Sequence, residues 1–147
     1  MNLGSLADDA GFLLSRASGL VVRGANAVLA EHGLRVRQYS VLSLAVDAAD
    51  GISQRDLAGA LGLDPSQVVG LVDELQAAGL VDRRPSPGDR RTRLVVATAR
   101  GCEVRAAAAE GARADVRRQL GALTGAEQET LRALLARVVT EAGSRGD

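Results

Sequence analysis

The chain has 147 residues, enough for one domain or for a small module with extra helices that a partner must cover. Apolar residues make up 46% of it while Phe12 and Tyr39 are the only aromatic residues, so its core must be built from Leu, Val and Ala, which favours helices over an all-β fold. A formal net charge of zero removes the simplest argument for nucleic-acid binding, a basic chain, and leaves the distribution of charge to decide.

All 18 cationic residues are arginines, which indicates the coding bias of a GC-rich bacterial genome. Arginine is nevertheless the better bidentate partner for phosphates and guanine edges. The single cysteine, Cys102, excludes an internal disulfide, and the first residues lack the basic and apolar parts of a secretion signal. Apolar runs are too short to cross a membrane, so we expect a cytoplasmic protein with no membrane contact.

Two helices are predicted before residue 50. Apolar residues recur at helical spacing over Leu6–Leu29, and the pair His32-Gly33 ends this helix. Three glycines weaken it by about 1 kcal/mol each relative to alanine, so it must rely on packing against other helices or a second subunit. The second helix is predicted over Val36–Ala48.

Two short capped helices follow, joined by a turn of about four residues that contains a glycine. Each begins with a capping box, and the second has Pro65 at its first position, where proline is favoured. This spacing is typical of a helix-turn-helix. The capping pairs are Ser53 with Asp56 and Asp64 with Gln67, and the closing glycines are Gly62 and Gly79.

A β-hairpin is predicted next, from strands at Leu80–Val81 and Arg93–Ala97. Pro87 and Gly88 occupy the central positions that a type II turn prefers. From residue 82 to residue 93 there are five arginines and two aspartates, and we expect Asp89 to pair with one of these arginines. A solvated charged turn would explain an isolated cluster of this kind, but its position beside two capped helices favours a wing that reaches DNA phosphates or a narrow minor groove.

Two further helices end the chain. Thr98 can cap a long helix to about Leu120, and Thr124 with Glu127 forms a capping box that opens a last helix to about Ala142. The last helix carries a wide apolar stripe that a monomer would expose, so we expect a twofold-symmetric homodimer. The fold class is therefore mainly α with a small β-hairpin wing, with residues 35–98 as the winged helix-turn-helix and residues 1–34 and 99–147 as the helical dimerisation region.

Candidate DNA contacts lie on the outward side of these elements. The second capped helix presents Gln67 and Val69, which suit an adenine edge and a thymine methyl group, although the capping box alone also explains Gln67. The backbone N–H groups at the two helix starts are candidates for phosphates. The full set is Arg37, Gln38, Ser53, Gln54, Arg55, Ser66, Gln67, Val69, Gly70, Arg83, Arg84, Arg90, Arg91 and Arg93.

The segment SQRDLAGALGLDPSQVVGLVDELQAAGLVDRRPSPGDRRTRLVVATARG, residues 53–101, resembles the MarR family of winged-helix regulators. It matches the pattern LA..LG.D.S.V..LVD.L...GLV.R....DRR...V..T..G, with Asp89-Arg90-Arg91 as its most specific part, and the flanking helices agree in number and length. The resemblance implies a transcriptional regulator, most often a repressor, which binds a palindromic operator as a homodimer and is released by a ligand or by oxidation. It also implies that Arg91 enters the minor groove.

The chain departs from many relatives in its second capped helix. Val69 and Gly70 stand where Ser or Thr followed by Arg is frequent, and Glu74 stands where a basic residue is frequent. More of the readout is then left to the wing and to DNA shape. The family's usual pocket implies a small aromatic or amphipathic acid as effector, held by Arg16 or His32 beside Tyr39 and Leu42, whereas an exposed Arg16 and a helix-capping His32 are the simpler interpretations.

Two alternative functions are weighed against this interpretation, and the role of Cys102 is left open. A winged helix that only makes protein contacts is disfavoured by the arginine-rich hairpin and by the absence of a further domain after it in this sequence. An enzyme is disfavoured because one His and one Cys offer no metal cluster and no nucleophile with its base, so we expect no catalytic residue, metal or cofactor. Cys102, at the start of a helix, is either a redox switch or an ordinary thiol.

Overall fold

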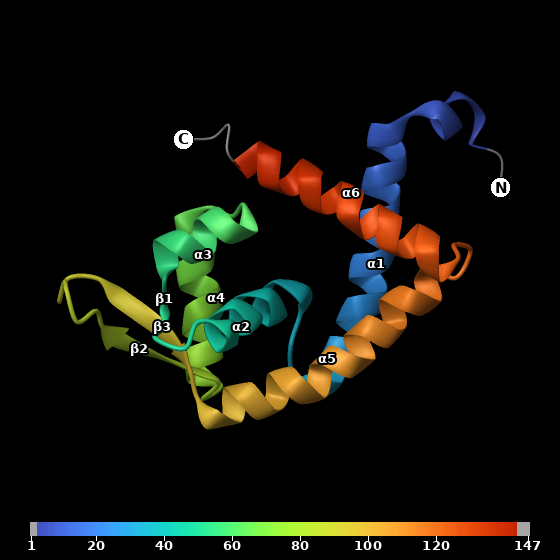
Figure 1. Cartoon of the computed structure of the whole chain (residues 1–147). Coiled ribbons are helices and arrows are strands. Elements are labelled where there is room, and N and C mark those ends of the chain that lie inside the picture. The colour runs from blue at the N-terminus through green and yellow to red at the C-terminus, as the bar shows by residue number, and fades with distance from the viewer. Residues whose placement is uncertain (1–2, 144–147) are drawn as a thin grey trace.

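The computed structural model describes residues 3–143, and Figure 1 shows their arrangement as a compact lobe of short elements beside three longer helices. The lobe contains α2, α3, α4 and a three-stranded sheet, and α5 leaves it to run alongside α1 before the chain reverses into α6. The elements are η1 (Gly4–Asp8), α1 (Ala10–Leu29), η2 (Ala30–His32), α2 (Val36–Asp47), β1 (Ile52–Ser53), α3 (Gln54–Leu61), α4 (Pro65–Ala77), β2 (Val81–Pro85), β3 (Arg93–Ala97), α5 (Ala99–Gln119) and α6 (Gly125–Gly143).

The N-terminal helix is shorter than the periodicity predicts. A turn of 3-10 helix, η1, precedes it, and the Asp9 side chain accepts a hydrogen bond of 2.8 Å from Phe12 N, so that α1 begins at Ala10. The predicted continuous helix from Leu6 is wrong because Asp9 provides an N-cap there. At the other end the chain turns through Gly33 at φ 70°, as the His32-Gly33 pair predicts.

The capped helices of the helix-turn-helix form as the sequence predicts. Ser53 accepts from Asp56 N at 3.1 Å, and α3 ends at Gly62 with φ 61°. Asp64 and Gln67 form the reciprocal capping box that opens α4. The inward residues Val68, Val72 and Leu75 are fully or almost fully buried, which fixes the side of α4 that faces the core.

The wing is a three-stranded antiparallel sheet in the order β1-β3-β2, one strand more than the predicted hairpin. The first hairpin strand runs from Val81 to Pro85, further than predicted, and Leu80 is buried in the core instead. The predicted type II turn at Pro87-Gly88 is wrong, because Gly88 does not have the positive φ that the turn requires. The tip instead closes through Thr92 N, which donates to the Asp89 carbonyl at 3.0 Å.

Two close contacts involve α5, one with the lobe and one with α1. Thr98 caps α5 by accepting from Gly101 N, and Gly101 lies so close to the wing that an added Cβ would be 2.0 Å from the Leu80 carbonyl oxygen. Further along α5 the buried Asp115 is bonded to Arg118 and Gln119 and lies against Gly24 of α1. Gly24 therefore permits the close approach of α1 and α5.

The two terminal elements leave much of their apolar surface open. Within the described residues, α6 has no buried residue, and the buried residues of α1 lie only in its second half. No helix in residues 3–143 has the length and apolar character that crossing a bilayer requires. The exposed large apolar side chains of α1 and α6 are Leu13, Leu14, Leu20, Val22, Leu134, Val138 and Val139.

Candidate nucleic-acid interface

The outward side of α4 carries four predicted contact residues. Ser66, Gln67, Val69 and Gly70 are all exposed, and Val69 retains 40% of its accessible surface. Their position follows from the helical period, because the buried Val68, Val72 and Leu75 face the core. A Cβ added at Gly70 would meet nothing within 4 Å, so the backbone at this point of the helix is open to a partner from outside.

The hydrogen-bonding groups at the start of α4 bind one another. The Ser66 hydroxyl donates to Asp64 Oδ1 at 2.5 Å and Ser66 N donates to the same oxygen at 2.8 Å. These bonds, the hydroxyl bond first, hold the pKa of the Asp64 carboxyl below its ordinary value. With Gln67 N also bonded, to the Asp64 carbonyl at 3.0 Å, this helix start presents a carboxylate and not the free N–H groups expected for a phosphate.

Most of the wing arginines are unpaired. Arg84, Arg90, Arg91 and Arg93 are exposed, and none has an ion pair with a residue of the described chain. Asp89 does not pair with an arginine side chain as expected; it accepts from Arg91 N at 2.9 Å and from the Thr92 hydroxyl at 3.0 Å. Asp89 therefore shapes the tip while the guanidinium groups remain free for other anions.

Arg83 differs from its neighbours. Its side chain is only 19% exposed and forms a 2.7 Å ion pair with Asp73 of α4. It also donates to Gln54 Oε1 at 2.9 and 3.0 Å and to Gln76 Oε1 at 2.7 Å. Arg83 thus ties β2 to α3 and α4, and it occupies the side-chain oxygen of Gln54, another predicted contact. Sequence reasoning missed this role, since the five wing arginines look alike without the fold.

The remaining predicted contacts lie around the two capped helices and the start of α2. Arg55 and Arg37 are exposed and have no ion pair within residues 3–143, whereas Ser53 is occupied with capping α3. Gln38 is bound twice, since its Oε1 accepts from Arg35 N at 2.9 Å and its Nε2 donates to Glu74 of α4 at 2.5 Å.

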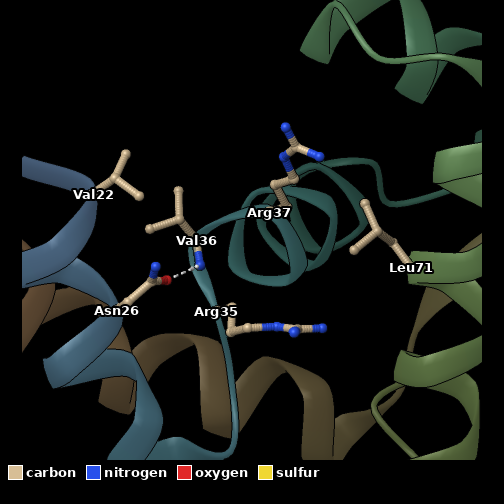
Figure 2. A pocket seen from close by; sticks show the side chains of 6 residues that line it. All are labelled: Val22, Asn26, Arg35, Val36, Arg37 and Leu71. Carbon is tan, nitrogen blue, oxygen red and sulfur yellow. Dashed lines mark hydrogen bonds between the residues drawn. The ribbon is translucent and has the colours of Figure 1, made fainter. Parts of the chain in front are cut away.

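A cavity of about 450 Å³ opens between α1, α2 and α4, next to this surface. Figure 2 shows Val22 and Asn26 on the α1 side, Leu71 on the α4 side, and Arg35 and Arg37 from the start of α2 between them. Asn26 Oδ1 accepts from Val36 N at 2.9 Å, which ties α1 to α2 at the cavity wall. Two guanidinium groups beside apolar side chains suit an anionic ligand with an apolar part.

The four predicted effector residues do not share a cavity. Arg16 lines a separate hollow of about 250 Å³ with Phe12 and Arg23, and Tyr39 lines a groove of about 750 Å³ between α5 and α6. Leu42 is a core residue with none of its surface exposed, so it does not line a site in this chain. His32 lies in the last turn of η2.

Sequence reasoning missed Asn26 and Arg35, which line the cavity between α1, α2 and α4. The one available signal was an amide within the apolar pattern of α1. Cys102 is an exposed free thiol.

A capped helix pair with an exposed outward side, flanked by an arginine-bearing sheet, defines a winged helix-turn-helix, a class of DNA-binding fold. A family profile described as the MarR family matches residues 32–92. A MarR-family transcriptional regulator of Rhodococcus sp. RHA1 is 44% identical, covering 92% of this chain and 95% of its own, with a TM-score of 0.88. The chain belongs to the MarR family of transcriptional regulators.

Two other similar solved structures are complexes, one with a small molecule and one with DNA. CouR of Rhodococcus jostii RHA1 bound to p-coumaroyl-CoA is 44% identical, covering 92% of this chain and 94% of that chain, with a TM-score of 0.84. A structure of the transcriptional repressor CouR bound to a 23-mer DNA duplex is 31% identical, covering 97% of this chain and 98% of that chain, with a TM-score of 0.80.

Proposed function

We propose that this regulator is a repressor that binds a palindromic operator as a homodimer. The observation that carries the proposal is the set of exposed, unpaired arginines Arg84, Arg90, Arg91 and Arg93 beside the outward side of α4. Unpaired guanidinium groups on a wing can enter the minor groove or bind phosphates while α4 lies in the major groove. The DNA-bound repressor CouR supports the same function.

The dimer in this proposal is formed by α1, α5 and α6. Apolar side chains such as Leu134 and Val138, which are 50% and 60% exposed, would be buried by a second copy. The residues before 35 and after 98 then form the dimerisation region, and residues 35–98 form the DNA-reading part. Two copies related by a twofold axis would present two α4 helices to half-sites about one DNA turn apart.

The effector in this proposal is an anionic compound with an aromatic or apolar part, and it lowers the affinity for DNA. The cavity between α1, α2 and α4 supports it, because Arg35 and Arg37 offer positive charge within reach of the DNA-reading helix. The likeness to CouR, whose structure holds p-coumaroyl-CoA, makes an aromatic acyl thioester of coenzyme A the first compound to test. An effector site at Arg16 remains a prediction. It is wrong if Arg16→Ala leaves the affinity for aromatic acids unchanged.

The experiment is a titration of the purified protein with DNA from its own promoter region at several salt concentrations. We expect a specific complex whose affinity falls steeply with salt, and an Arg91→Ala variant that binds about tenfold or more weakly with a salt slope smaller by about one. If both proteins bind every DNA equally weakly, the winged helix serves protein contacts and the proposal fails. A second titration adds p-coumaroyl-CoA, with free p-coumarate and free coenzyme A as separate controls for the two halves of the thioester.

A further inference from the structure

Glu74 links the DNA-reading helix to the rim of the cavity. Its carboxylate, on the exposed side of α4, accepts a hydrogen bond of 2.5 Å from Gln38 Nε2 and forms an ion pair of 3.3 Å with Arg35 Nη2. Both partners belong to the start of α2. Among the ion pairs of the described residues, this one alone joins α2 to α4.

Arg35 has two roles that compete. It lines the cavity between α1, α2 and α4, and Figure 2 shows its side chain extended from the start of α2 toward α4. The same guanidinium group is held by Glu74 on α4. An anion that enters the cavity therefore meets an arginine whose charge is already partly satisfied by a carboxylate of the protein.

We infer that Glu74 is an internal competitor for Arg35, and that an anionic effector in the cavity displaces it and so loosens α4 from α2. This inference rests on the proposed effector and states how its binding reaches the DNA. A phosphate or carboxylate bound to Arg35 places two negative groups close together, so that the effector and the Glu74 contact oppose each other. Because α4 carries the outward residues Gln67 and Val69, loss of the contact moves the surface that faces DNA.

The size of the effect follows from the exposure of the pair. Arg35 and Glu74 retain 67% and 50% of their side-chain surface, so water screens their attraction. The Gln38 bond adds to it because a charged acceptor strengthens a hydrogen bond. Together they account for about a two- to fivefold change in equilibrium constants. The coupling is reciprocal, so the effector weakens DNA binding by the factor by which DNA weakens effector binding.

The test substitutes Glu74 by Gln, which keeps the shape and an acceptor for Gln38 but removes the charge. We expect Glu74→Gln to bind p-coumaroyl-CoA about two- to fivefold more tightly in the absence of DNA. The ratio of DNA affinities without and with p-coumaroyl-CoA should fall by a similar factor. Glu103→Gln, which removes an exposed carboxylate of α5, is the matched control and should change neither quantity.

A double-mutant cycle with Arg35→Gln separates direct contact from the general loss of a negative charge. In the Arg35→Gln background, Glu74→Gln should give no further change, whereas a general charge effect would persist there. Equal coupling ratios in the unmodified protein and Glu74→Gln would overturn this inference while leaving the proposed function intact. If p-coumaroyl-CoA does not affect DNA binding by the unmodified protein, the proposed effector fails and the coupling fails with it.

Discussion

The DNA-reading lobe and the terminal helices contrast in how they bury apolar residues. The lobe holds most of the core, in which Val41, Leu57, Val68, Val81 and Val95 have no exposed surface although they come from different elements. Ala25 and Leu29 of α1 and Ala108 of α5 join the same core. In the described part of the chain, α6 has no buried residue and the first half of α1 has none either. The difference teaches that one part of the chain builds the core, whereas α6 and the first half of α1 leave apolar side chains exposed, as the proposed dimer would require.

The largest effect is expected where the second copy would bind. Leu134→Glu with Val138→Glu adds two charges to one side of α6, since residues four apart lie together on a helix. We expect a folded monomer whose affinity for a palindromic operator falls by about 10² to 10⁴-fold, because the two half-sites are no longer bound together. Size-exclusion chromatography with light scattering and a DNA titration measure both changes.

The control for this prediction is Ala77→Glu at the exposed end of α4, outside the helices of the proposed dimer. It should leave the oligomeric state unchanged. A dimer that persists in the α6 double variant would remove the proposed interface and the contrast between the two regions.

The second prediction concerns the joint between the regions, at Gly101. Gly101→Ala would place a Cβ 2.0 Å from the Leu80 carbonyl oxygen and 3.2 Å from Leu42 Cδ1, so α5 must shift from the wing. We expect a loss of about 1 to 3 kcal/mol in the free energy of unfolding, as for overpacking in a core. Urea denaturation checks it, with Gly59→Ala as control.

Gly59 lies inside α3 and an added Cβ there would meet nothing within 4 Å. This control should gain about 0.5 to 1 kcal/mol, the helix-forming advantage of alanine. If both variants are stabilised, the contact between α5 and the wing is looser than the geometry indicates.

The smallest effect distinguishes two neighbouring arginines within the lobe. Arg84→Gln removes an exposed unpaired guanidinium, so the salt slope of DNA binding should fall by about one while the unfolding temperature stays unchanged. Arg83→Gln breaks the bonds to Asp73, Gln54 and Gln76, so the unfolding temperature should fall while the salt slope is kept. Salt-dependent titrations and thermal unfolding of both variants make the comparison. A reduced slope for Arg83→Gln would instead make it a phosphate contact.

Local signals predicted the helix-turn-helix because they act over three or four residues. The caps at Asp64 and Thr98 and the closing glycine at Gly62 appear where the sequence places them. The turn at Pro87-Gly88 failed because the preference of a dipeptide is weaker than the hydrogen bonds that Asp89 makes at the wing tip. The strand β1 was missed since two residues carry too little pattern to identify it.

The candidate site was predictable in part, for the same reason. Exposed positions such as Val69 and Arg91 follow from the helical period and from the hairpin. The four effector residues, by contrast, depend on which helices meet, and the fold separates Arg16 from Tyr39 and buries Leu42. Asn26 acts through a partner 10 residues away in the chain, and Glu74 acts through partners 39 and 36 residues away. No local pattern contains such pairs.

The sequence by itself determined the order of the helices, their caps, the arginine-rich wing and the family, because these depend on spacing and on residue type. Only the tertiary structure decided which arginine of the wing is held inside, that Arg35 is shared between a cavity and Glu74, and that Gly24 and Gly101 lie at close contacts. The physical reason is that charge and size are properties of a residue, whereas partners and clearances arise only when distant segments pack together.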